Sequence, residues 1–186
     1  MPWPMETISH HAAERHQLHP IHVNFKIPSE VHDVLEKVTM EDKISLNALV
    51  NQILSKYVSF ERAMVDEPVV VPKQLFAELV STFPEEQAKA VGTFLGAKLR
   101  RDFAFHRINQ DSEAILNFHL RQMGTYSGWY DLEVSRTDAR IRAALLHEYG
   151  QIWSAFLTKY YQSAIRAVTG AEPRTEQEGG TLVITF

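Results

Sequence analysis

Residues 20–62 open with alternating apolar and polar positions and continue with apolar residues at helical spacing. The alternation ends at Pro28, and a period of two is typical of a half-buried β-strand. Two apolar stripes follow, separated by the charged residues 41–43, and each has the spacing of one face of a helix. Ser29 and Ser45 are suited to cap these helices. The pattern therefore predicts one strand followed by two helices.

A single strand with two amphipathic helices cannot bury its own apolar side. The strand lacks a hydrogen-bonding partner, and the helices leave their stripes half covered. A second copy supplies both, because two strands can pair across a two-fold axis while four helices enclose the stripes. The sequence therefore predicts a homodimer with a shared core that contains Val23, Phe25, Ile27, Leu49 and Ile53.

The stretch IHVNFKIPSEVHDVLEKVTMEDKISLNALVNQILSKYV resembles the ribbon-helix-helix family of transcription regulators, the Arc, MetJ and CopG type. The matching features are the alternating strand ended by Pro28, the cap at Ser29 and the Ser-x-Asn-Ala-Leu-Val run at the second helix start. The resemblance covers under a quarter of the chain and implies a dimeric two-stranded ribbon in the major groove of double-stranded DNA. By position, it implies that the bases are read by His22, Asn24 and Lys26. It also implies that a backbone phosphate is bound by Ser45, Leu46 and Asn47.

Two features of this segment differ from the family pattern. Many members have glycine between the helices, where this chain has Glu41, Asp42 and Lys43. Residues 20–64 also hold five Lys and Arg against six Asp and Glu, which limits non-specific attraction to DNA. The alternative is therefore a ribbon that dimerises without binding DNA.

Residues 73–186 have the pattern of an α+β domain with an antiparallel sheet. Helices are predicted over 73–82, from Pro84 to about residue 106, and after a cap at Asp111. Two alternating segments then predict a hairpin, and a long aromatic helix follows over about 148–168. Residues 182–184 predict a closing strand. In the hairpin we expect cross-strand pairing of two acidic with two basic residues: Asp131 and Glu133 with Arg140 and Arg142.

Composition and charge narrow the class of protein. The 186 residues are 45% hydrophobic and 23% charged, which is ordinary for a globular protein. The net charge of −4 gives no overall basic field, and the absence of cysteine excludes disulfides and thiolate metal sites. No apolar run approaches the roughly 18 to 20 residues of a membrane helix. The N-terminus lacks the features of a signal peptide, so we expect a cytoplasmic protein without membrane partners.

The C-terminal domain carries few candidates for chemistry. It has neither a Gly-x-Ser-x-Gly nor a His-Glu-x-x-His motif, and no reaction can be assigned. His106, His119 and His147 could converge on a metal ion, but the apolar face of its helix favours a core role for His119. The aromatic stripe that includes Trp153 could line a ligand pocket, although packing against the sheet is the simpler interpretation. We therefore expect no metal, no cofactor and no enzymatic activity, with His119, His147 and Trp153 as weak candidates for ligand contacts.

The resemblance, together with these patterns, implies a homodimeric, sequence-specific DNA-binding transcription regulator of the repressor kind. Residues 1–19 would be a flexible arm, 20–62 the DNA-binding unit, 63–72 a linker and 73–186 an effector or oligomerisation domain. The last domain could bring two dimers together as a tetramer, through a sheet edge or the aromatic face, or bind a small-molecule effector. The alternatives are a dimeric interaction protein that does not bind DNA and an enzyme built on residues 73–186.

Overall fold

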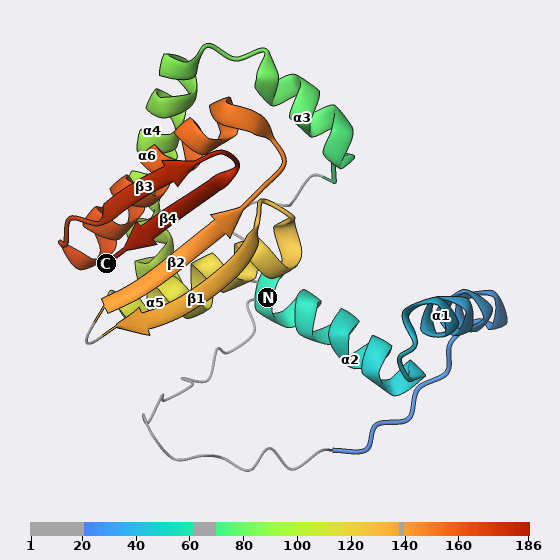
Figure 1. The fold of residues 1–186 in the computed structure, drawn as a ribbon. Helices are drawn as coiled ribbons and strands as arrows, with labels where there is room; N and C mark the ends of the chain where they lie inside the picture. Colours follow the sequence, from blue (N-terminus) through green and yellow to red (C-terminus); the bar gives the residue numbers. More distant parts are fainter. Residues whose placement is uncertain (1–20, 62–69, 138–139) are drawn as a thin grey trace. The chain divides into compact units, whose positions relative to one another are not determined.

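The computed structural model describes residues 21–61, 70–137 and 140–186 (Figure 1). These residues form two compact units, with the boundary between Leu46 and Asn47. The predicted arm over 1–19 and most of the predicted linker over 63–72 lie outside the described residues. In the described part of the chain, no helix has the length and apolar character needed to cross a membrane.

The N-terminal unit contains an extended segment, 21–28, and helix α1 (Ser29–Asp42). The segment forms no strand with any described residue, so the strand predicted here is not seen in a single copy. The prediction that Ser29 caps α1 is wrong by one residue. Pro28 occupies the cap, because its φ of −57° leads directly into the helix, and Ser29 is the first helical residue. Lys43 ends α1 in the left-handed conformation, and its N–H donates to the Thr39 carbonyl.

Helix α2 (Leu46–Lys56) begins at the boundary and continues into the π-helical turn η1 (Tyr57–Glu61). The second predicted helix is therefore present, with its apolar stripe extended into η1. At the end of this segment Phe60 is buried, and its ring centre lies 5.6 Å from that of Tyr126. This contact attaches η1 to the C-terminal fold.

The remaining chain is a mixed α+β fold, which confirms the predicted fold class for residues 73–186. Its helices and turns are α3 (Lys73–Ser81), α4 (Glu85–Phe105), α5 (Ser112–Ile115), η2 (Leu116–Leu120), η3 (Met123–Ser127) and α6 (Gly150–Thr169). Its strands are β1 (Asp131–Thr137), β2 (Arg140–Leu146), β3 (Arg174–Glu178) and β4 (Thr181–Thr185). The strands form one antiparallel sheet in the order β1-β2-β4-β3, and α4, α5 and α6 lie on one of its faces (Figure 1).

The predicted ion pairing across the first hairpin is wrong. Thr137 pairs with Arg140 and Ser135 pairs with Arg142, whereas Asp131 and Glu133 pair with residues at the opposite end of β2. The reason is geometric, because partners in an antiparallel hairpin are equally distant from its turn.

Two glycines allow α4 to approach α6 closely. An added Cβ at Gly92 would lie 2.5 Å from the carbonyl oxygen of Phe156, and one at Gly96 would collide with the carbonyl oxygen of Tyr160. The Ser163 hydroxyl also donates a hydrogen bond of 2.9 Å across this contact to the Thr93 carbonyl. The small residues at 92 and 96 therefore set the spacing of the helix pair.

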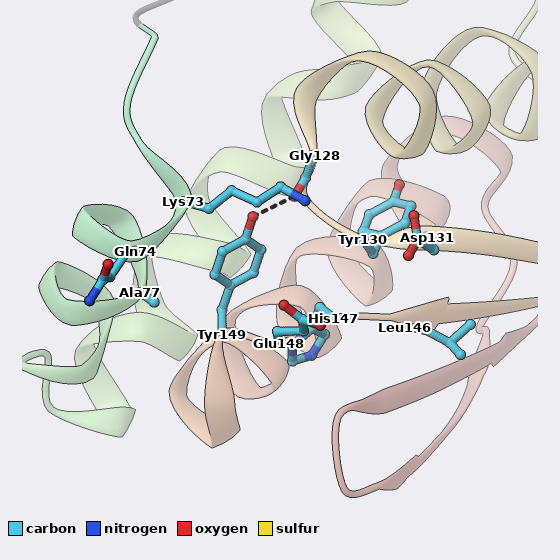
Figure 2. A pocket seen from close by; sticks show the side chains of 10 residues that line it. All are labelled: Lys73, Gln74, Ala77, Gly128, Tyr130, Asp131, Leu146, His147, Glu148 and Tyr149. Atoms are coloured by element: carbon cyan, nitrogen blue, oxygen red, sulfur yellow. Dashed lines mark hydrogen bonds between the residues drawn. The ribbon is translucent and has the colours of Figure 1, made fainter. Parts of the chain in front are cut away.

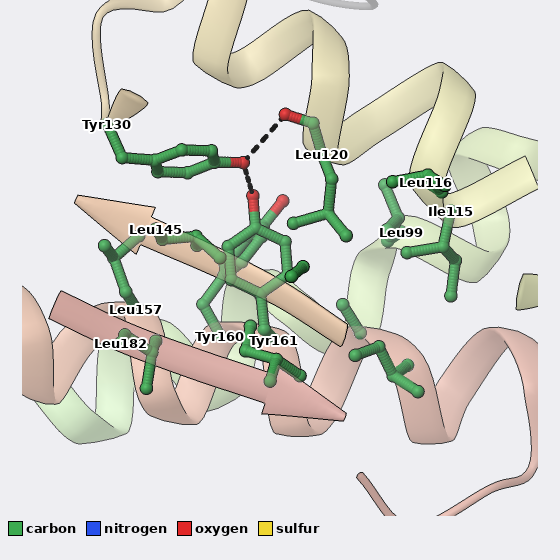
Figure 3. Close-up of a cluster of buried hydrophobic side chains, with 14 of the residues drawn as sticks. Leu99, Ile115, Leu116, Leu120, Tyr130, Leu145, Leu157, Tyr160, Tyr161 and Leu182 are labelled. Atoms are coloured by element: carbon green, nitrogen blue, oxygen red, sulfur yellow. Dashed lines mark hydrogen bonds between the residues drawn. The ribbon is translucent and has the colours of Figure 1, made fainter. Parts of the chain in front are cut away.

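The core between the helices and the sheet contains three buried tyrosines (Figure 3). Tyr130 donates its hydroxyl to the Leu120 carbonyl at 3.1 Å, and it is also hydrogen-bonded to the hydroxyl of Tyr161. Because Tyr130 has one proton and gives it to Leu120, Tyr161 donates to Tyr130. Burial raises the pKa of Tyr130, Tyr160 and Tyr161, so all three are neutral. The aromatic stripe of α6 is thus part of the core, as the simpler interpretation holds.

Candidate functional site

The candidate DNA-contacting residues lie on the extended segment 21–28 and at the start of α2. His22, Asn24 and Lys26 are exposed, and no ion pair ties any of them to another described residue. The apolar residues between them are exposed as well: the exposed fraction is 86% for Ile21 and 59% for Phe25. A single copy therefore gives this segment no buried side.

The start of α2 carries the second candidate group. Ser45 and Asn47 are exposed and Leu46 is half-buried, at the end of the helix where backbone N–H groups point outward. The Asn47 carbonyl accepts a hydrogen bond of 2.8 Å from the Asn51 side chain, which leaves the Asn47 side chain out of that contact. A helix start of this kind has the partial positive charge that suits a phosphate.

The helices of residues 29–61 expose most of their apolar stripes. No residue of α1 is buried, and Leu49 is the buried residue of α2. Several large apolar side chains are about half exposed: Val31, Val34, Ile53, Leu54, Tyr57 and Val58. Exposed apolar side chains in this number are typical of helices that pack against another surface. Of the predicted dimer core residues, Ile53 is on α2, and Val23 and Phe25 on the extended segment are exposed as well.

A cavity of about 350 Å³ opens on the C-terminal fold between the start of α3, the sheet and the start of α6 (Figure 2). Its wall carries charges of both signs, from Lys73, Asp131 and Glu148. On one side, Tyr149 donates its hydroxyl to the Gly128 carbonyl at 2.7 Å, which fixes the ring at the rim. A cavity of this size, with charged and apolar groups in its wall, can hold a small molecule.

His147 lies on the wall of this cavity. Its Nε2 is 2.9 Å from the hydroxyl of Ser154 on α6, while its buried Nδ1 has no hydrogen-bond partner among the described residues. Burial lowers the pKa of His147, so the ring is neutral near pH 7. Of the three weak candidates for ligand contacts, this is the one that the structure places at a cavity.

His119 and Trp153 are core residues instead. His119 is hydrogen-bonded through Nε2 to the Tyr160 hydroxyl at 2.9 Å, and the Trp153 indole N–H donates to the Trp129 carbonyl at 3.1 Å. His106 lies at the end of α4 against Phe105. In the described residues no three His, Asp or Glu side chains come close enough together to hold a metal ion. The possible convergence of His106, His119 and His147 on a metal is therefore wrong, because His119 is hydrogen-bonded to Tyr160 in the core, His147 lies on the cavity wall and His106 lies at the end of α4.

The sequence did not indicate Lys73, Asp131 or Glu148 as site residues. They come from three separate segments, and neither their spacing nor their neighbours distinguish them from ordinary surface charges. Only the packing of α3 against α6 beside the ends of β1 and β2 brings them together.

The buried state of His119 predicts a pH dependence of stability. Burial lowers its pKa to about 4, against about 6.5 in an unfolded chain. Between these values the unfolded chain binds the proton and the folded chain does not, so stability falls as the pH falls from 6.5 to 4. The expected loss is about 3 kcal/mol in the free energy of unfolding.

The measurement is chemical unfolding of the wild type and of His119→Gln at several pH values. Glutamine keeps a polar partner for Tyr160 but does not titrate, so the variant should lose less stability over the same interval. Parallel curves for the two proteins would show that His119 does not carry the effect.

No protein-family model matches the chain, and no curated protein matches it either.

Proposed function

We propose that this protein is a homodimeric, sequence-specific DNA-binding transcription regulator whose residues 20–62 form a ribbon-helix-helix unit. The observation that supports it best is the exposed apolar surface of segment 21–28, α1 and α2 in a single copy. A second copy would cover this surface by pairing the two extended segments and enclosing the helices between them.

Pairing of the segments would sort their side chains onto two faces. Val23, Phe25 and Ile27 would turn toward the helices, and the alternate residues would face outward, because successive side chains of a strand point to opposite sides. A two-stranded ribbon fits the major groove, where asparagine can pair with adenine and lysine can reach the acceptors of guanine. His22, Asn24 and Lys26 are therefore the proposed base-reading residues, while the α2 start would bind a phosphate.

The experiment compares the wild type with a triple alanine variant at His22, Asn24 and Lys26. Binding sites are selected from random double-stranded DNA and then measured by electrophoretic shift at two salt concentrations. The wild type should select a sequence and bind it more weakly at the higher salt. Each good base contact contributes about 1–3 kcal/mol of discrimination, so the variant should lose the preference while it stays dimeric.

A matched control replaces Asp33, Glu36 and Lys37 by alanine. These residues are exposed on α1 of the same unit, so the control should still select the wild-type sequence. If the triple variant at 22, 24 and 26 selects that sequence too, the ribbon is not the part that reads DNA.

One observation favours a second candidate, a dimeric interaction protein that does not bind DNA. Residues 20–64 carry more acidic than basic residues, which weakens attraction to phosphates. A wild-type dimer without sequence preference at either salt concentration would favour this candidate.

In either case the cavity at Lys73, Asp131 and Glu148 is the place where the C-terminal fold would bind a small polar effector.

A further inference from the structure

Helix α4 has two apolar faces, and only one of them is covered. The first contains Gly92 and Gly96 and packs on α6. The second, which we call the α4 stripe, is exposed to solvent and consists of Val91, Phe94, Leu95 and Phe105. The exposed fraction is 62% for Phe94 and 72% for Phe105. Single exposed apolar residues are ordinary, but several on one helix face mark an interaction surface.

Two opposite charges lie within the α4 stripe. Lys98 and Asp102 follow Val91, Phe94 and Leu95 at intervals of three and four residues, so they share the same side of the helix. The Lys98 ammonium is 4.1 Å from the ring centre of Phe94, and the Asp102 carboxylate is 3.8 Å from Arg101, with no ion pair between Lys98 and Asp102 themselves. The stripe thus carries a positive charge two residues before Arg100 and a negative charge two residues after it.

From this arrangement we infer that a second copy of the chain docks on the α4 stripe, with the two α4 helices antiparallel about a two-fold axis. In that arrangement Lys98 faces the partner's Asp102, and Asp102 faces the partner's Lys98. The same register sets Leu95 opposite the partner's Phe105. Arg100 is midway in the sequence between Leu95 and Phe105, as it is between Lys98 and Asp102. The stripe is complementary to itself in charge as well as in apolar character, which is why the occupant is a second copy and not an unrelated protein.

The size of the stripe sets the strength of the contact. A standard interface buries about 800 Å² on each partner, and one helix face with four large apolar side chains offers less. The α4 contact is therefore weak between free chains and stronger between chains already held together elsewhere. It does not depend on the proposed function, because the stripe lies outside residues 20–62.

The sequence suggested two surfaces for assembly, a sheet edge and the aromatic face, and the α4 stripe takes the place of the second. The aromatic face of α6 is buried in the core, so it is not available to another chain. The α4 helix covers that face through Gly92 and Gly96 and presents its own stripe outward.

The test uses cross-linking in the full-length chain, which has no cysteine of its own. Leu95 and Phe105 are both replaced by cysteine, and the protein is oxidised with oxidised glutathione. Ten residues of helix separate the two positions by about 15 Å, whereas a disulfide needs Cα atoms about 4.4–6.8 Å apart. A disulfide between the two cysteines of one chain is therefore excluded, and any disulfide between two protein cysteines joins two copies.

The matched control places the same two cysteines, again ten residues apart, at Ala90 and Arg100. Both are exposed on α4 but lie away from the stripe. The stripe variant should give at least tenfold more disulfide-linked dimer than the control on a non-reducing gel. Equal yields in the two variants, or no linked dimer in either, would overturn the inference. Far-UV circular dichroism checks that both variants keep the fold.

Charge reversal then tests the register in the stripe variant. Adding Lys98→Glu places a carboxylate opposite the partner's Asp102 and should lower the yield several-fold. Mixing this protein with a stripe variant that carries Asp102→Lys restores both charge pairs, so the mixed dimer should form at the original yield. If charge reversal leaves the yield unchanged, the proposed antiparallel register is wrong.

Discussion

Replacing Ile53 by aspartate is expected to dissociate the proposed dimer and to unfold the helices of residues 29–61. Ile53 lies on α2, and its exposed fraction in a single copy is 49%. If the chain were monomeric, a carboxylate at such a position would change stability by roughly 0.5 kcal/mol. In a shared core, the same carboxylate loses its hydration without gaining a partner, which costs several kcal/mol. The size of the effect therefore reports whether the surface is covered by a second copy.

Sedimentation equilibrium measures the association, and far-UV circular dichroism measures the helix content over a range of concentrations. The control is Gln52→Asp, which adds the same charge at the adjacent, exposed position on the polar side of α2. The control should remain as associated as the wild type. If Ile53→Asp behaves like Gln52→Asp, residues 20–62 do not form a shared core.

Replacing Gly96 by leucine is expected to disrupt the pair of helices α4 and α6. The first added carbon, Cβ, already collides with the Tyr160 carbonyl, and backbone cannot move aside as the end of a flexible side chain can. Helix propensity alone would favour the change by about 1 kcal/mol, because glycine is a poor helix former. The collision must exceed this gain, and we expect a net loss of about 3 kcal/mol or more.

Thermal and urea unfolding of the full chain measure this loss. Ala97→Leu is the matched control, since Ala97 is the next residue of α4 and is exposed. That change should alter the free energy of unfolding by less than about 0.5 kcal/mol. A Gly96→Leu protein as stable as the control would mean that the two helices do not approach as closely as the structure shows.

Local patterns predicted the elements of the C-terminal fold well. Asp111 caps α5 by accepting a hydrogen bond of 2.7 Å from the Ala114 N–H, and Gly170 ends α6 with a φ of 76°. Both features depend on a few neighbouring residues, so they can be recognised without the rest of the fold. The closing strand predicted at residues 182–184 is also present, as part of the hairpin of β3 and β4.

The candidate site depends more strongly on residues that are far apart in the sequence. His119 and His147 look equivalent as histidines, yet one is hydrogen-bonded in the core and the other lies on a cavity wall. The ion pair of Arg136 with Glu113, at 2.9 Å, joins β1 to α5 and has no counterpart in any local pattern. Such contacts require knowledge of which elements pack against each other.

The sequence by itself predicted the order and type of most elements of residues 73–186, because periodicity, caps and turns act over a few residues. For residues 20–62 the sequence pattern predicted a second copy as partner, and that partner stays a prediction. Only the tertiary structure decided which apolar stripes stay exposed. The stripe of α6 is buried because Gly92 and Gly96 let α4 lie against it, whereas Phe94 and Phe105 on the other face of α4 remain in solvent. The apolar residues of the α6 stripe and of the α4 stripe have the same helical period. Whether such a stripe is buried depends on which element packs against it.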